Sequence, residues 1–175
     1  MKTESFNYLN QGKMRFIGID AWRTGDDWGG LWERTEDFLP VLDTLMKDYS
    51  VGVLEPCSLL HSGGKDVGIE EHFLAGYFFK ADTPVPKGYD FYDIETECVG
   101  YAVYVTDNIG IDMENAYAMT RDKILGDGHL VPYPQGYWHA EVYTNGRPHD
   151  GEYRFGYMFP VIDDVKKVNN RYAEY

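Results

Sequence analysis

The chain has 175 residues, with 29 acidic and 16 basic side chains and a formal net charge of −13. At about 150 residues per domain, this length predicts one domain, or one domain built by duplication. Phosphate affinity comes from Lys and Arg, so this charge argues against nucleic acid or an anionic membrane as the main partner. The sequence has no run of about 18 apolar residues, and its N-terminus lacks the apolar region of a signal peptide. We therefore expect a cytoplasmic protein.

Aromatic side chains make up 16% of the sequence, and 15 of them are tyrosines. Tyr and Trp combine a large apolar body with one polar handle, which suits both a β-rich core and a half-wet pocket. An aromatic core and a pocket for a flat or hydrophobic organic ligand are thus both open interpretations. Cys57 and Cys98 have no CxxC spacing, and the histidines lack the spacing of metal ligands. We expect no metal and no cofactor.

The first half of the chain, about residues 14–82, has the pattern strand, helix, strand, strand. Periodicity predicts strands at 14–23, 50–55 and 70–81 and a helix at 31–47. Pro40 lies inside the helical pattern and predicts a kink or a break there. The stretch 56–66 is rich in turn formers and is predicted as a loop.

The same order of elements follows a Pro- and Gly-containing connector at 83–90. In the second half, about 91–162, strands are predicted at 98–106, 137–144 and 152–162, a helix at 111–125 and a hairpin loop at 145–151. The tail at 163–175 is polar. We therefore predict a single α+β domain over 1–175 with eight principal strands in an antiparallel sheet, two long helices and pseudo-two-fold symmetry. Ligands bind in clefts, and the cleft is expected where the halves meet.

The strand predicted at 137–144 places a carboxylate among aromatic rings. Alternation puts four polar or amphipathic side chains on one face and three apolar ones on the other: Tyr137, His139, Glu141 and Tyr143 against Trp138, Ala140 and Val142. A glutamate in mid-strand is disfavoured by β-propensity. Either this face is wet, or Glu141 lies at the floor of an aromatic pocket. In a pocket the buried charge favours a cation, and each ring adds about 0.5–2 kcal/mol of cation–π attraction.

Several motifs together resemble the GyrI-like small-molecule-binding domains, which are also the effector-binding domains of AraC-type and multidrug-sensing regulators. The resemblance covers about residues 14–162. It rests on the order and spacing of five segments: MRFIGIDAWRTG, LWERTEDFL, AGYFFKADTPVPKGYDFYDIETECVGYAVYVTD, HAEVY and FGYMFPV. It implies a duplicated strand–helix–strand–strand fold. It also implies binding of hydrophobic, often cationic compounds for sequestration or sensing, with Glu141 matching the glutamate that meets the ligand.

On this resemblance we predict a ligand site around Glu141 with six further ring-bearing side chains: Tyr143, Tyr104, Trp32, Trp22, Tyr157 and His139. An alternative is a hydrolase of reactive electrophilic small molecules. Some GyrI-like proteins resemble hydrolases of cyclopropane-bearing compounds that use a Glu and a Tyr. Here Glu141 would be the general base, with Tyr143 or Tyr104 orienting it. A second alternative is a protein-interaction domain whose negative charge attracts a basic partner.

The chain departs from the family pattern where Trp138 and His139 replace the usual acidic pattern before Glu141, and at two further places. Tyr117 is nearest to the Trp of the family's second helix, and Gly52 occupies the first-half position that matches Glu141. The departure at Gly52 predicts a one-sided ligand site. No DNA-binding module is recognised beside the domain, so a stand-alone member is expected.

Overall fold

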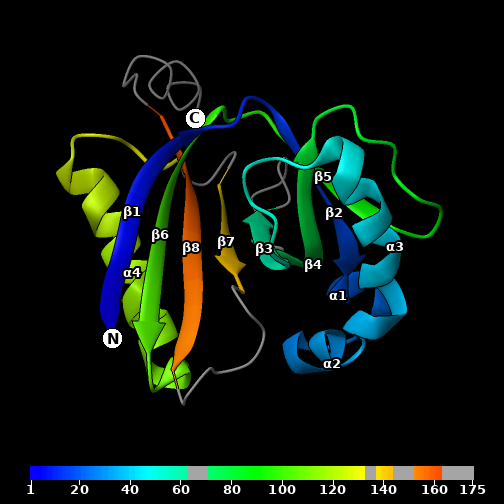
Figure 1. Ribbon diagram of the computed structural model, residues 1–175, viewed down its shortest axis with the longest axis horizontal. Helices are drawn as coiled ribbons and strands as arrows, with labels where there is room; N and C mark the ends of the chain where they lie inside the picture. Colours follow the sequence, from blue (N-terminus) through cyan, green and yellow to red (C-terminus); the bar gives the residue numbers. More distant parts are fainter. Residues whose placement is uncertain (63–70, 133–136, 144–151, 163–175) are drawn as a thin grey trace, which may run out of the picture.

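The computed structural model describes residues 1–62, 71–132, 137–143 and 152–162 (Figure 1). Over these residues the chain forms one antiparallel sheet of eight strands in the order β1-β6-β8-β7-β3-β4-β2-β5. The strands are β1 (Lys2–Asn10), β2 (Met14–Asp20), β3 (Cys57–Ser62), β4 (Glu71–Lys80), β5 (Asp90–Ile94), β6 (Cys98–Thr106), β7 (Trp138–Val142) and β8 (Tyr153–Val161). The helices are α1 (Ala21–Thr24), α2 (Trp28–Glu33), α3 (Thr35–Tyr49) and α4 (Ile109–Gly126). The predicted α+β class is confirmed.

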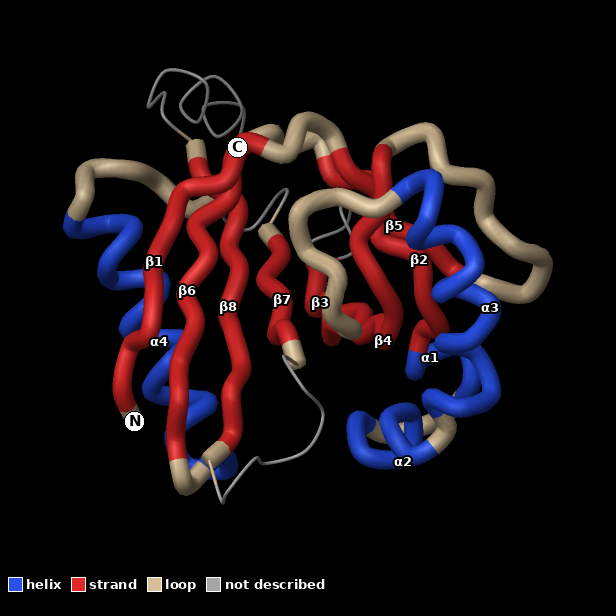
Figure 2. Tube along the Cα trace, viewed as in Figure 1, coloured by secondary structure: helices blue, strands red, loops and turns tan. Residues whose placement is uncertain are grey.

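The strand order is symmetric about the central pair β7 and β3, as the repeated element order predicts. On one side β8 and β6 follow β7, and on the other β4 and β2 follow β3. The edge strands β1 and β5 extend β6 and β2. Figure 2 shows α4 beside one half of the sheet and α1–α3 beside the other, with β7 and β3 between the two helical groups. No helix in the described part of the chain has the length and hydropathy of a bilayer-spanning segment.

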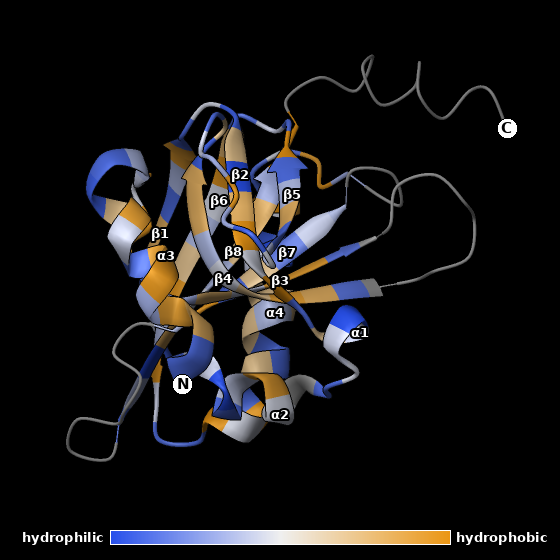
Figure 3. Cartoon of the chain, turned by 90° about the vertical axis from the view of Figure 1, so that its right-hand side faces the viewer, coloured by the Kyte–Doolittle hydropathy of each residue, from blue (hydrophilic) through white to orange (hydrophobic). Residues whose placement is uncertain are grey.

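Packing on the two faces of the sheet differs. On one face, α4 packs over β6 and β8, and α1–α3 pack over β2 and β4. Figure 3 shows the apolar stripe of α3 in orange. On the other face lies a separate core that includes Trp138, Phe16 and Phe78. Val53, from the segment after α3, is also buried in this core.

The predicted strand at 50–55 is wrong. Of this segment only Ser50 forms an isolated bridge, and the second strand of the first half is β3, inside the stretch predicted as a loop. Val51 and Val53 still pack on the core, but as a loop rather than in the ladder. Tertiary burial has therefore overridden their strand propensity.

The predicted helix at 31–47 is divided at Arg34, where the backbone leaves helical geometry with φ −104° and ψ 12°. Pro40 lies inside α3, so the predicted break at Pro40 is wrong. The missing N–H of a proline removes one helical hydrogen bond. Burial of Phe38 and Leu42 on the inner face of α3 offsets that loss. The predicted hairpin loop at 145–151 and the tail at 163–175 lie outside the described residues.

Local capping explains where the short helices begin. The Asp20 side chain caps α1 by accepting from the Trp22 backbone N–H at 2.8 Å. The Asp27 side chain caps α2 by accepting from the Gly30 N–H at 2.8 Å. Asp is among the residues most favoured at this position. The cap at Asp27 fixes the start of α2, the helix that carries Trp32.

Candidate ligand-binding site

Glu141 lies in β7, one of the two central strands of the sheet. Figures 1 and 2 show β7 between the two helical groups. Its register partners are Ser58 on β3 and Tyr157 on β8. Trp138, Ala140 and Val142 face the opposite core, as alternation predicts. Only 6% of Glu141 is exposed, so the interpretation of a solvated face is wrong.

Two tyrosine hydroxyls bind the carboxylate of Glu141. Tyr143 donates to Oε2 at 2.5 Å, and Tyr157 donates to Oε1 at 2.7 Å. Tyr143 follows the end of β7 two residues after Glu141, which places it on the same side of the strand. Each carboxylate oxygen therefore has one hydrogen bond from a neutral donor.

Within the described part of the chain, the carboxylate of Glu141 forms no ion pair with a basic side chain. Burial raises the pKa of its carboxyl group, and the hydrogen bonds from Tyr143 and Tyr157 lower it in part. Burial, together with the nearby carboxylate, raises the pKa of both tyrosine hydroxyls, so they keep their protons. An incoming cation would supply the missing charge.

An uncharged aromatic wall lies on one side of Glu141. His139 Nδ1 is 3.0 Å from the Tyr137 hydroxyl, which is 2.7 Å from the Tyr117 hydroxyl. The His139 ring stacks on Phe159, with centroids 5.7 Å apart and an interplanar angle of 24°. Burial lowers the pKa of His139 to about 4, so its ring is neutral at neutral pH. Sequence reasoning placed Tyr137 on this face but did not include Tyr137 or Tyr117 in the site.

On the other side, α2 brings Trp32 to the site. Its indole Nε1 donates to Ser58 Oγ at 2.9 Å. The Trp32 ring meets Tyr143 edge-on, with centroids 4.7 Å apart at 65°. Ser58 is fully buried and was missed, because its segment was predicted as a loop. Gly52, which was matched to Glu141, lies outside the strands, and Ser58 is the residue beside Glu141 in the first half.

Two predicted site residues lie elsewhere. Tyr104 is 2% exposed, and its hydroxyl is 2.8 Å from that of Thr120 in α4, so it belongs to the core under that helix. Trp22 is 59% exposed and lies 5.7 Å from the ring of His72, whose Nδ1 pairs with Asp20. The predicted residues that gather around Glu141 are thus Tyr143, Tyr157, Trp32 and His139.

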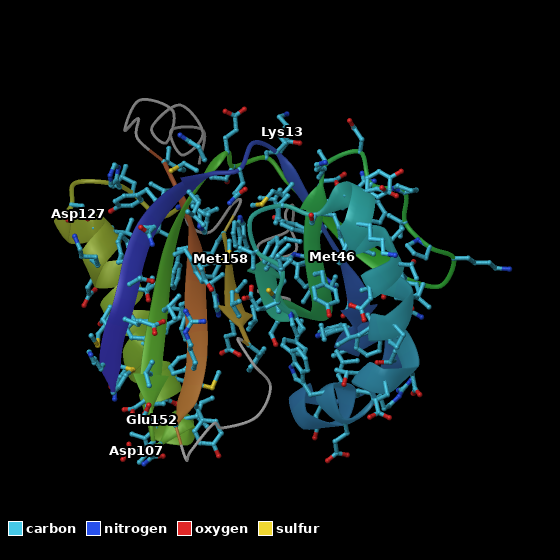
Figure 4. The ribbon with its side chains drawn as sticks, in the orientation of Figure 1. Lys13, Met46, Asp107, Asp127, Glu152 and Met158 are labelled. Atoms are coloured by element: carbon cyan, nitrogen blue, oxygen red, sulfur yellow. The ribbon has the colours of Figure 1, made fainter. Side chains whose placement is uncertain are left out.

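Other polar features of the described surface do not form a comparable site. Within the described ranges, no group of three His, Cys, Asp or Glu side chains is arranged to hold a metal ion. A hollow of about 490 Å³ is lined by residues that include Met1, Asp107 and Glu152. Figure 4 labels the last two at the N-terminal end of β1. That hollow lies at the start of β1, the end of β6 and just before β8, and Glu141 does not line it.

The pKa of Glu141 predicts how its removal changes stability. Burial raises the pKa of Glu141 in the folded state. Its contribution to the stability of the fold is therefore fully present below the pKa of the unfolded chain, and it is lost as the pH rises through the pKa of the folded protein. Glu141→Gln, which cannot ionise, should therefore raise the melting temperature at about pH 8 and should have little effect near pH 4, where free carboxyl groups protonate. Thermal unfolding at both pH values checks this. Glu114→Gln, on the exposed surface of α4, is the control, and an equal gain in both variants would contradict the assignment.

No family model matches the sequence, and no curated protein does. The structure is similar to that of SAV2435 bound to tetraphenylphosphonium, with a TM-score of 0.58, 12% identity and both chains covered over 100%. A hydrolase encoded by lin2189 from Listeria innocua gives a TM-score of 0.55 at 12% identity, over 90% of this chain and 92% of that one. An integron cassette protein from the mobile metagenome of Vibrio cholerae gives a TM-score of 0.52 at 9% identity, over 91% of this chain and 97% of that one.

These similarities establish the fold. The chain has the duplicated antiparallel architecture of the GyrI-like domains, which agrees with the resemblance of its sequence motifs. Sequence identities near 10% show a shared fold and leave the ligand to be argued from the site itself.

Proposed function

We propose that this chain binds hydrophobic cations at Glu141 in order to sequester or sense them. The observation that carries the proposal is a carboxylate 6% exposed, held by two neutral hydroxyls and paired with no cation among the described residues. A buried carboxylate without a counter-charge is costly, and a cation beside it removes that cost. The fold of the SAV2435 complex with tetraphenylphosphonium supports this ligand class.

The surroundings of Glu141 favour a lipophilic cation over a strongly hydrated one. The side chains beside it are the rings of Trp32, Tyr143, Tyr157 and His139, and the histidine is neutral. A small hydrated ion would lose its water and gain few polar partners there. A cation shielded by aromatic groups loses little hydration and gains contacts with the rings. The expected ligands are aromatic phosphonium, quaternary ammonium and delocalised dye cations.

Thermal unfolding with tetraphenylphosphonium chloride tests the proposal. A ligand at about 100 times its dissociation constant adds about 2.7 kcal/mol to the free energy of unfolding. For a chain of this size, that corresponds to a rise in melting temperature of about 5–11 °C. Sodium chloride at the same concentration is the control. No rise at millimolar ligand would contradict the proposal.

A hydrolase is the second candidate, and the Tyr–Glu–Tyr geometry favours it. The two hydroxyls orient the carboxylate of Glu141, and a raised carboxyl pKa suits a general base that takes a proton from water. One solved structure with this fold is named a hydrolase. Turnover of an electrophilic substrate that Glu141→Gln abolishes with affinity intact would favour the enzyme. Binding without turnover would favour the binder.

We also propose that nucleic acid is not a ligand. The net charge of −13 opposes association with phosphate, and phosphate neutralisation supplies most nonspecific affinity. A salt-sensitive gel shift with the purified protein would contradict this.

A further inference from the structure

A chain of hydrogen bonds connects α2 to Glu141 through Ser58. Trp32 Nε1 donates to Ser58 Oγ at 2.9 Å, and Ser58 Oγ donates to the Tyr143 hydroxyl at 3.4 Å. Tyr143 then donates to Glu141. The donors of this chain are all directed toward the carboxylate, and the contact of 3.4 Å between Ser58 and Tyr143 is its weakest link. Ser58 is fully buried, and its register beside Glu141 fixes its place.

Among the four rings beside Glu141, Trp32 is the one carried by a short helix rather than by the sheet. His139 and Tyr157 lie in the strands β7 and β8, and Tyr143 directly follows β7, whereas Trp32 reaches the site from α2. Trp32 belongs to a six-residue helix in which two glycines precede it. The opposite face of the sheet beneath Glu141 is a packed core. Because only 6% of Glu141 is exposed, a ligand that contacts its carboxylate has to displace a neighbouring side chain, and Trp32 is the described ring beside it that the sheet does not carry.

We propose that Ser58 is a positioning residue that holds Trp32 across the entrance to Glu141 and thereby sets how fast ligands enter and leave. The inference rests on the proposed function, because it assumes that a ligand reaches Glu141. Entry breaks the bond between Trp32 and Ser58, and the bond reforms when the ring closes. Loss of this hydrogen bond lowers the barrier both to ligand entry and to ligand exit. The association and dissociation rates therefore change more than the affinity does.

Stopped-flow binding of tetraphenylphosphonium to Ser58→Ala tests this. Both the association and the dissociation rate should rise by about 2- to 12-fold, the range equivalent to one net hydrogen bond, while their ratio changes less. Thr44→Ala is the matched control, because the exposed Thr44 hydroxyl donates to the Val41 carbonyl within α3 and has no other bond among the described residues. Rates in Ser58→Ala equal to those of the control would overturn the inference.

A double-mutant cycle identifies Trp32 as the group through which Ser58 acts. Trp32→Phe keeps a ring but removes the N–H donor. In that background Ser58→Ala should change both rates by less than it does in the wild-type protein, since the bond to Trp32 is already absent and only the longer bond from Ser58 to Tyr143 remains to be lost. Fully additive effects would contradict the role of Ser58 in holding Trp32.

A measurement on the free protein separates failure of this inference from failure of the proposed function. The sequence has four tryptophans, and Trp32→Phe assigns the Trp32 indole N–H among their NMR signals. In Ser58→Ala this N–H should exchange with solvent about 2- to 12-fold faster. An unchanged exchange rate overturns the inference, whether or not a ligand binds. Absence of cation binding to the wild-type protein contradicts the proposed function and leaves the Trp32 measurement valid.

Discussion

Replacing Glu141 by Gln is expected to lower the affinity for tetraphenylphosphonium by about 30- to 5,000-fold. This range corresponds to the about 2–5 kcal/mol lost when one partner of a buried charge pair is removed. Gln keeps the volume of the side chain and an oxygen that accepts from Tyr143 or Tyr157, but it carries no charge. The contacts between the ligand and the rings of Trp32 and His139 persist. Isothermal calorimetry of both proteins measures the difference.

Triphenylphosphine oxide is the comparator, because it presents similar phenyl groups without a net charge. Its affinity should change by less than about fivefold in Glu141→Gln, the scale of about one net hydrogen bond. We expect Glu141 to set the preference for the cation over the neutral compound, rather than the affinity for both. Equal losses for the cation and the neutral compound would show that Glu141 does not sense charge.

Gly76→Ala is expected to produce the largest loss of stability. Gly76 on β4 lies opposite Gly18 on β2, and a Cβ at Gly76 would lie 2.0 Å from the backbone oxygen of Ile17. Backbone atoms cannot move aside without opening the pairing of the two strands. We expect a loss of about 3 kcal/mol, the upper end of the usual cost of overpacking, and a fall in melting temperature of about 6–12 °C. Gly76 also pairs with Cys57, so the distortion reaches the residue before Ser58.

Gly110→Ala is the matched control for this substitution. Gly110 lies in the first turn of α4, and nothing lies within 4 Å of an added Cβ. Ala is the better helix former, so this variant should gain up to about 1 kcal/mol. Thermal unfolding of the two variants compares the same chemical change at two sites. A Gly76→Ala protein as stable as Gly110→Ala would contradict the close approach of β2 and β4.

The repeated architecture could be predicted because its main elements have clear periodicity. The helix predicted at 111–125 and the strand predicted at 152–162 correspond to α4 and β8 within a few residues. The edge strand β1 begins with Lys2 and has only exposed and half-buried residues, so it has little hydrophobic signal. The strand β3 was obscured by Pro56 on one side and glycines on the other, which are typical turn formers.

The candidate site was partly predictable for a related reason. Alternation along one strand is enough to place His139, Glu141 and Tyr143 on the same side. Neighbours from other strands depend on register, which no local pattern fixes. Tyr104 was misplaced for this reason: β8 separates its strand from β7, and α4 covers it. Ser58 required both the correct strand and the correct register.

The most direct test of the account is to count the protons released when tetraphenylphosphonium binds. Calorimetry in buffers of different ionisation enthalpy gives that number. Because burial raises the pKa of Glu141 and a cation favours its charged form, binding should release protons at pH values near that raised pKa. Affinity should rise with pH over the same range. Triphenylphosphine oxide should release none, and Glu141→Gln should release none with either ligand. Tight binding of the cation with no proton released at any pH from about 4 to 8, a range that spans free and raised carboxyl pKa values, would contradict the account.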